Sequence, residues 1–305
     1  MRMRCQILIG VAAAQLGLGA AGAEPVRVVT TIFPLADWAR AVGGDRVEVK
    51  PLLPPGVEIH TYSPKPSEVL ALHRAGVFIY LGDDLEPWAE DLLDGLPEPR
   101  PMVIEAGRGI PRLCGHEEHE AHDGHGHATD PHLWLDPVLA QDIVAAIAEG
   151  LAQADPEGRE TYLARAAAYR VELQQLHEEI QAGLQTCRHR RILYAGHFAF
   201  GYFARRYGLE HVSPYAGFSP NAMPTPSQIA ALIVLLRESG QKILFHEELL
   251  DPRVGRVIAG ETGARLEVLH TAHNLTREQH ERGGMTYLSI MRENLAKLRA
   301  ALECP

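Results

Sequence analysis

The 305-residue sequence has a deficit of basic side chains, with 29 Lys and Arg against 39 Asp and Glu and a formal net charge of −10. Proteins that bind nucleic-acid phosphates usually carry the opposite excess, so no nucleic-acid partner is expected. Beyond residue 23 the sequence also lacks an apolar run close to the roughly 20 residues that a membrane-spanning helix needs. Neither DNA or RNA binding nor a spanning helix is therefore expected.

The first 23 residues have the three regions of a secretory signal peptide. Met1-Arg-Met-Arg4 is basic, an apolar run follows from Ile7 to Ala21, and Ala21-Gly22-Ala23 is a small-residue cleavage site. Cys5 precedes the apolar run, which is the wrong side for a lipid-modified cysteine. We therefore expect an exported, periplasmic protein that begins at Glu24. Without Arg2 and Arg4 it has 27 basic and 39 acidic side chains, a net charge of −12.

Cysteine is scarce, and no second cysteine lies near Cys114, which excludes a zinc finger of the Cys2His2 type. Cleavage of the leader leaves Cys114, Cys187 and Cys304 in a compartment that permits disulfides. Cys187 ends a long helical stretch and Cys304 lies one residue from the C-terminus, so a disulfide between these two is the preferred pairing. Cys114 is then either a free thiol or an auxiliary soft ligand.

Histidine is abundant by contrast, with 16 in the chain and a dense group in the segment 114–129. That segment is too rich in Gly, Asp and His to form a packed element, and imidazole is a common ligand of zinc and similar metals. A mobile loop of this kind would bind zinc more weakly than a preformed site, because ordering it costs entropy. We assign it an auxiliary role in metal binding, through His116, His119, His122, His125 and His127.

Strand-like runs alternate with amphipathic helices, which predicts two open-sheet α/β lobes. One thirty-residue helix from Glu157 to Thr186 is longer than either lobe needs, and we interpret it as a rigid connector with a metal cleft between the lobes beside it. The predicted division is signal peptide 1–23, N-terminal lobe 24–154, connecting helix 155–187 and C-terminal lobe 188–305. The predicted strands are Val26–Ile32, Val47–Leu53, Val77–Leu81, Met102–Ile104, Arg191–Ala195, His211–Ser213, Lys242–Phe245 and Leu266–Leu269.

Four histidines lie in predicted strand-to-helix connections, where open α/β sheets place their ligands. They are His60, in a proline-rich loop, His132, His197 and His273. Two come from each lobe, so a metal ion could be held between the facing edges. Other histidines are expected to be solvated side chains: His73, His177, His189, His211 and His280.

Four sequence blocks resemble the periplasmic substrate-binding proteins of the zinc and manganese ABC importers, the cluster A-I proteins. The blocks are Gly56–Glu68, Asp130–Leu135, Gly196–Gly208 and Tyr287–Asn294, and with the connector they span essentially the whole mature chain. The resemblance implies a non-enzymatic monomer that captures one metal ion between two lobes and delivers it to an ABC permease with its ATPase. It also implies that His60, His132 and His197 are ligands.

The identity of the ligands points to zinc within that family. Manganese-type members have glutamate at the third ligand position, where this chain has His197, and imidazole favours Zn²⁺. The family normally has an aspartate at the fourth position, but the matching residue here is His273, with His270 as the second candidate. An all-histidine site keeps a charge of +2, and Glu247 is expected to compensate for it from behind the ligands.

Two alternatives from other classes remain open. A zinc-dependent hydrolase would fit a three-histidine site with an open position and Glu247 nearby. The segment His116-Glu-Glu-His119 is not a zincin motif, because its histidines are spaced i, i+3 in a Gly-rich loop. A metal chaperone or adhesin working without a transporter is the second alternative, and neighbouring permease and ATPase genes would argue against it.

Overall fold

The N-terminal lobe is built on one parallel sheet, as the alternation of strands and helices predicts. The computed structural model describes residues 24–113, 129–215, 217–218 and 223–305. The strands lie in the order β2-β1-β3-β4, and β3, an uninterrupted apolar run, is buried along its whole length. These strands are β1 (Val26–Thr30), β2 (Val47–Pro51), β3 (Val77–Tyr80) and β4 (Met102–Glu105).

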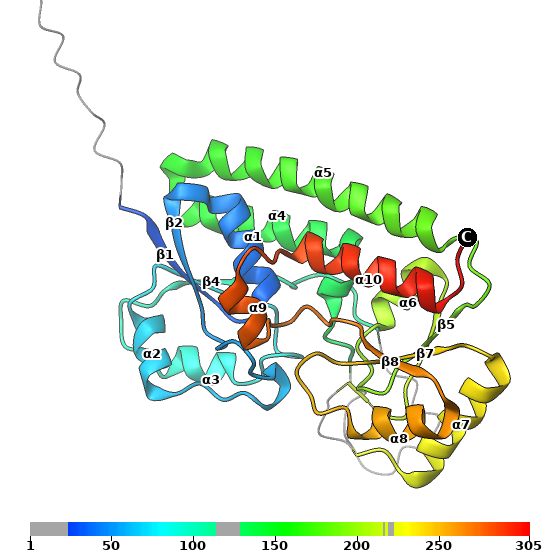
Figure 1. The fold of residues 1–305 in the computed structure, drawn as a ribbon. Coiled ribbons are helices and arrows are strands. Elements are labelled where there is room, and N and C mark those ends of the chain that lie inside the picture. Colours follow the sequence, from blue (N-terminus) through cyan, green and yellow to red (C-terminus); the bar gives the residue numbers. More distant parts are fainter. Residues whose placement is uncertain (1–23, 114–128, 216, 219–222) are drawn as a thin grey trace, which may run out of the picture.

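Helices cover both faces of this sheet (Figure 1). On one face α1 and α4 close a core that contains Trp38, and on the other α2 and α3 enclose Phe78 and Leu72. Because both faces are buried, the central strand β3 is an apolar run without alternation. The helices are α1 (Phe33–Gly43), α2 (Pro66–His73), α3 (Ala89–Asp94) and α4 (Pro137–Ala154).

The C-terminal lobe has a second parallel sheet made of two strand pairs. A bridge between Tyr194 and Phe245 joins the pairs, and the Ala195 N–H donates to the Phe245 carbonyl at 2.7 Å, so the order is β6-β5-β7-β8. The elements of this lobe are β5 (Arg191–Leu193), β6 (Glu210–Val212), β7 (Ile243–His246), β8 (Arg265–Val268), α6 (Gly201–Tyr207), α7 (Pro226–Ser239) and α8 (Arg253–Thr262). Helices α9 (Arg277–Arg282) and α10 (Tyr287–Ala301) follow them in the chain.

The long helix α5 (Arg159–Leu184) runs along both lobes (Figure 1). Its buried residues recur every three or four positions from Tyr162 to Leu184, and they face α4, α1 and α10. At 1.5 Å per residue the helix is about 39 Å long. The expected fold, two α/β lobes joined by a long helix, is confirmed. Within the described residues, neither α5 nor another helix combines the length and apolarity needed to cross a bilayer.

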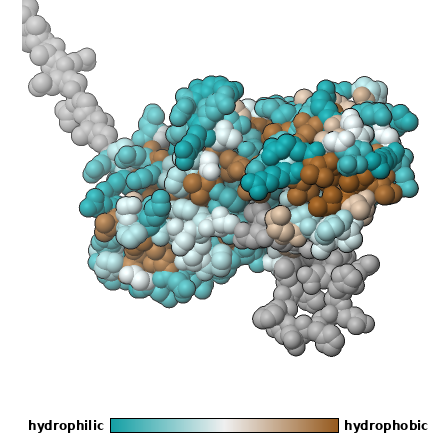
Figure 2. Space-filling view, turned by 60° about the horizontal axis from the view of Figure 1, so that its bottom comes forward, coloured by the Kyte–Doolittle hydropathy of each residue, from teal (hydrophilic) through white to brown (hydrophobic). Residues whose placement is uncertain are grey.

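Helix α7 leaves apolar side chains at the surface of the C-terminal lobe. It is apolar from Ile229 to Leu236, yet among these residues just Leu232 and Leu236 are buried. Val234 is 50% exposed and Val257 of α8 is 57% exposed. Figure 2 shows apolar residues gathered at the end of the molecule where Figure 1 places α7 and α8. Helix α7 therefore presents an apolar strip to the outside.

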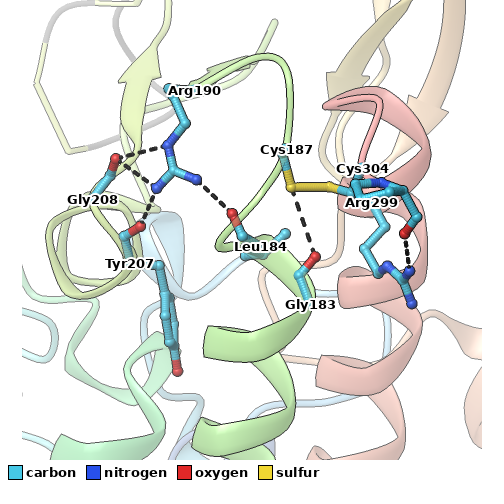
Figure 3. The surroundings of a disulfide bond; sticks show 9 residues. Gly183, Leu184, Cys187, Arg190, Tyr207, Gly208, Arg299 and Cys304 are labelled. Atoms are coloured by element: carbon cyan, nitrogen blue, oxygen red, sulfur yellow. Dashed lines mark hydrogen bonds between the residues drawn. A yellow bond between two sulfur atoms is a disulfide. The ribbon is translucent and has the colours of Figure 1, made fainter.

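The predicted disulfide between Cys187 and Cys304 is present, and it closes a sequence separation of 117 residues (Figure 3). Beside it, the Arg190 guanidinium donates to the Leu184 carbonyl at the end of α5 and to the Tyr207 and Gly208 carbonyls at the end of α6. Carbonyls at a helix C-terminus lack partners within the helix and carry a partial negative charge. Arg190 therefore fastens two helix ends together.

Replacing Arg190 by alanine is expected to lower the free energy of unfolding by about 2–3 kcal/mol, because charge-assisted hydrogen bonds to several carbonyls are lost together. Urea denaturation of the zinc-free protein measures this change. Arg299→Ala is the matched control, since the Arg299 guanidinium donates to the terminal Pro305 carbonyl, which is exposed (Figure 3). Equal losses in the two variants would contradict the proposed fastening of α5 and α6.

Candidate metal centre

Three histidine side chains from separate loops converge on one point. The Nε2 atom of His132 lies 3.2 Å from Nε2 of His60 and 3.0 Å from Nε2 of His197. The nitrogen atoms that these residues offer to a metal all lie within 4.8 Å of one another. His132 and His197 are buried, and His60 is partly exposed. These three imidazoles could hold a metal ion.

Strand and turn geometry places each of these histidines. His60 lies in a short turn, Ile59–Thr61, in the loop after β2, and its N–H donates to the Glu58 carboxylate at 3.2 Å. His132 immediately precedes the turn Leu133–Leu135. His197 follows β5 through Gly196, where a side chain would collide with the Glu247 carboxylate. The loops at the carboxyl ends of the strands thus bring together residues far apart in the sequence.

Two buried carboxylates lie behind the histidine cluster. Asp130 Oδ1 lies 2.8 Å from His132 Nδ1 and accepts the His132 N–H at 2.9 Å. Glu247 Oε1 lies 2.9 Å from His197 Nδ1 and accepts the His197 N–H at 2.7 Å. A proton on each Nδ1, facing a carboxylate, leaves the Nε2 lone pair directed at the cluster. The sequence pointed to Glu247, but Asp130, two residues before His132, was missed.

Burial keeps two imidazoles of the cluster, those of His60 and His132, neutral. It lowers the pKa of His132 well below its ordinary value, and the nearby His197 and His273 add to the effect. Burial, with His132 and His197 alongside, also lowers the pKa of His60 to about 2. A neutral imidazole has a free lone pair, so His60 and His132 can donate to a metal ion without first losing a proton.

His273 is placed next to the cluster but is not part of it. Its Nε2 lies 3.1 Å from Glu58 Oε2, and its Nδ1 lies 2.6 Å from the Thr271 hydroxyl. Burial opposes a charge on His273, but the carboxylates of Glu58, Glu248 and Glu247 outweigh burial and raise the pKa of His273 to about 9. Burial alone would raise the pKa of Glu58, but the nearby His273 lowers it below its ordinary value. The two side chains form a buried ion pair.

His270, the second candidate for the fourth position, makes contacts elsewhere. Its Nδ1 accepts the Ala272 N–H at 2.9 Å, and its Nε2 lies 3.2 Å from Gln279 Oε1 on α9. The expectation that His211 is solvated is wrong, because this residue is 8% exposed in the middle of β6. Its imidazole ring packs against the aromatic rings of Phe198 and Tyr194.

Several predictions from the sequence lie outside the described residues. They concern the signal peptide 1–23, Cys114, and the loop histidines His116, His119, His122, His125 and His127. The described part of that loop begins again at Thr129, and the Asp130 N–H donates to the Leu113 carbonyl at 2.8 Å. The described residues that flank the His-rich segment, Leu113 and Asp130, are therefore bonded to each other two positions before His132.

The chain is similar to proteins of zinc-uptake systems along almost its whole length. Residues 28–301 match the family model described as zinc-uptake complex component A, periplasmic (ZnuA). The chain is 32% identical over 284 residues to the high-affinity zinc uptake system protein ZnuA of Bacillus subtilis, covering 92% of this chain and 88% of that protein. It is 32% identical to the zinc-binding protein AdcA of Streptococcus pyogenes but spans just 55% of its length.

Solved structures of zinc-binding and metal-transporting proteins have a similar fold. The Zn(II)-bound ZnuA-like domain of AdcA from Streptococcus pneumoniae has a TM-score of 0.77 and 30% identity, covering 92% of this chain and 99% of that one. A laminin-binding protein of Streptococcus agalactiae, described as bifunctional with adhesin and metal-transporting activity, has a TM-score of 0.80 and 30% identity, covering 92% of this chain and 100% of that one. These proteins share the two-lobe fold with a long connecting helix.

Proposed function

Because this chain belongs to the family of periplasmic zinc-uptake complex components, we propose that it captures Zn²⁺ between its lobes and delivers it to an ABC permease driven by its ATPase. We further propose that it acts as a monomer in the periplasm after cleavage of residues 1–23. The zinc ion is cargo in this proposal and undergoes no chemical step. We also propose that the mature chain consists of an N-terminal lobe (24–154), a connecting helix (155–187) and a C-terminal lobe (188–305).

The observation that carries the proposal is the convergence of His60, His132 and His197 with their donor nitrogens within 4.8 Å. Zinc prefers a four-coordinate site with nitrogen and oxygen donors, and a carboxylate behind a ligating imidazole strengthens and orients it. Asp130 and Glu247 occupy that position behind two of the three imidazoles. We propose His273 as the fourth ligand, which requires that it leave its ion pair with Glu58.

The alternatives have less support. A hydrolase would need a general base free to reach a zinc-bound water, whereas the Glu247 carboxylate accepts the His197 N–H and faces its Nδ1. The related proteins reported above are named for zinc uptake and zinc binding, not for catalysis. An adhesin role is named for the Streptococcus agalactiae protein. Permease and ATPase genes beside the gene for this chain would favour transport over adhesion or chaperoning.

Competitive zinc titration of the mature protein, with and without residues 116–127, tests the proposed function. We expect one tight site in both proteins, at the histidine cluster, and additional weaker binding in the intact chain, through the His-rich loop. Parallel titrations with manganese measure selectivity. A mature protein that retains no zinc after the loop is deleted would rule out the cluster as the cargo site.

The ion pair of His273 predicts a pH dependence for zinc binding. With a pKa of about 9, His273 is protonated at pH 7.5, whereas His60 and His132 are neutral. Ligation by His273 must expel its proton, so we expect release of about one proton per zinc ion. Affinity should then rise with pH up to about 9, because fewer protons compete. Calorimetry in buffers of different ionisation enthalpy counts the protons.

His273→Ala is expected to abolish this proton release and to weaken zinc binding by about tenfold or more. His270→Ala is the comparison variant, and it should keep both the affinity and the proton count. Unchanged titration curves for His273→Ala would show that the fourth ligand is His270 or a water molecule. Weaker zinc binding in His270→Ala would then identify His270 as that ligand.

A further inference from the structure

The chain crosses from the C-terminal lobe to the N-terminal lobe beside the histidine cluster. On one side of the crossing, Thr271 donates through its N–H and its hydroxyl to the Glu248 carboxylate at 3.0 and 2.7 Å, within the C-terminal lobe. On the other side, the His273 carbonyl accepts the Phe33 N–H at 2.8 Å, at the start of α1. Ala272 lies between them with φ of +60°, a left-handed conformation rarely adopted by alanine.

Asn274 makes the most direct connection between this crossing and the loop that carries His60. It is 5% exposed, and its Nδ2 donates to the Pro54 carbonyl at 2.7 Å and to the Val57 carbonyl at 2.9 Å. Its Oδ1 accepts the Leu275 N–H at 2.8 Å. Both protons of the amide are therefore used to hold two points of one short loop.

A backbone hydrogen bond completes the contact, because the Gly56 N–H donates to the Leu275 carbonyl at 2.8 Å. Three hydrogen bonds thus join residues 54–57 to residues 274–275. The loop continues directly into Glu58 and His60, whereas residue 273 immediately precedes Asn274. The spacing of His60 and His273 is therefore set by a contact between these two segments and not by either sheet alone.

We propose that Asn274 is a positioning residue for the metal site: it clamps the loop Pro54–Val57 to the segment His273–Leu275 and so holds His60 in place for the ion. The inference rests on the proposed zinc-binding function. Small displacements of a ligand weaken metal binding strongly, since coordination geometry tolerates little error. A loosened His60 loop lets the ion leave sooner, so the clamp slows zinc release.

Asn274→Ala is expected to accelerate zinc dissociation by about tenfold, comparable with the loss of other residues that orient metal ligands. The rate is measured by stopped-flow transfer of zinc to a chromophoric chelator, well below the unfolding temperature. Asp37→Ala is the matched control. Like Asn274, Asp37 joins two segments far apart in the sequence, because on α1 it accepts the N–H of Tyr287, the first residue of α10, at 2.9 Å. Both variants should lose stability, but Asp37→Ala should release zinc at the wild-type rate.

A double-mutant cycle separates positioning from a general loss of structure. If Asn274 acts through His60, its replacement should change zinc dissociation little in a His60→Ala background. The visible spectrum of bound Co²⁺ should change in Asn274→Ala and stay unchanged in Asp37→Ala. Equal acceleration in Asn274→Ala and Asp37→Ala, or the same factor in both backgrounds, would overturn the inference. A wild-type protein that binds no zinc would instead overturn the proposed function.

Discussion

Replacing His132 by alanine is expected to lower zinc affinity by about 100- to 1,000-fold. A structural zinc site is worth roughly 10–16 kcal/mol, so one ligand in four accounts for about 3 kcal/mol, or two orders of magnitude. His132 is the central member of the cluster, because its Nε2 lies within 3.2 Å of Nε2 of both His60 and His197. Its loss also leaves the Asp130 carboxylate buried without its imidazole partner.

The measurement is a competition titration against a chelator of known zinc affinity, run on protein lacking residues 116–127 so that loop histidines do not contribute. His280→Ala serves as the control, since His280 is an exposed histidine on α9. Its affinity should equal that of the unsubstituted protein. If His132→Ala also titrates like the unsubstituted protein, the cluster is not the zinc site and the proposed function loses its main support.

Removing the disulfide is expected to have the largest effect on stability. The double variant Cys187→Ala, Cys304→Ala should lose about 3–5 kcal/mol of unfolding free energy, because a cross-link over such a long loop restricts the unfolded chain strongly. The bond joins residues separated by 117 positions and ties the last residues of the chain to the end of α5. Urea denaturation of the zinc-free protein measures the loss.

Reduction of the native protein provides the control for this variant. Reductant should shift the denaturation midpoint of the native protein by the same amount and leave that of the double variant unchanged. Zinc affinity should be retained in both, since neither cysteine lies at the histidine cluster. A double variant as stable as the native protein would show that packing of α10 on α5, and not the cross-link, holds the C-terminus.

Much of the site could be predicted because it lies where simple rules apply. Strands and helices alternate clearly in the sequence, and His60, His132 and His197 lie in the connections that lead from a strand to the next helix. The connecting helix was recognisable by its length alone. The disulfide followed from the positions of Cys187 and Cys304 near the ends of two helices.

The parts that were missed depend on tertiary contacts. Glu58 was not recognised as the partner of His273, because nothing in the local pattern relates residues 215 positions apart. Helix α9 was not predicted, since Arg277–Arg282 is polar and has no buried residues to give it a periodicity. The sequence block Asp130–Leu135 does not single out Asp130, although a carboxylate two residues before a histidine can turn back onto its Nδ1.

The crossing at residues 272–275 also bears on how the protein unfolds. The chain passes from the N-terminal lobe to the C-terminal lobe through α5, returns at this crossing, and leaves again through α10. One apolar cluster contains both Trp38 of the first lobe and Phe245 of the second. The two lobes therefore share part of their core, and we expect the zinc-free protein to unfold in one cooperative transition and separately produced halves not to fold on their own.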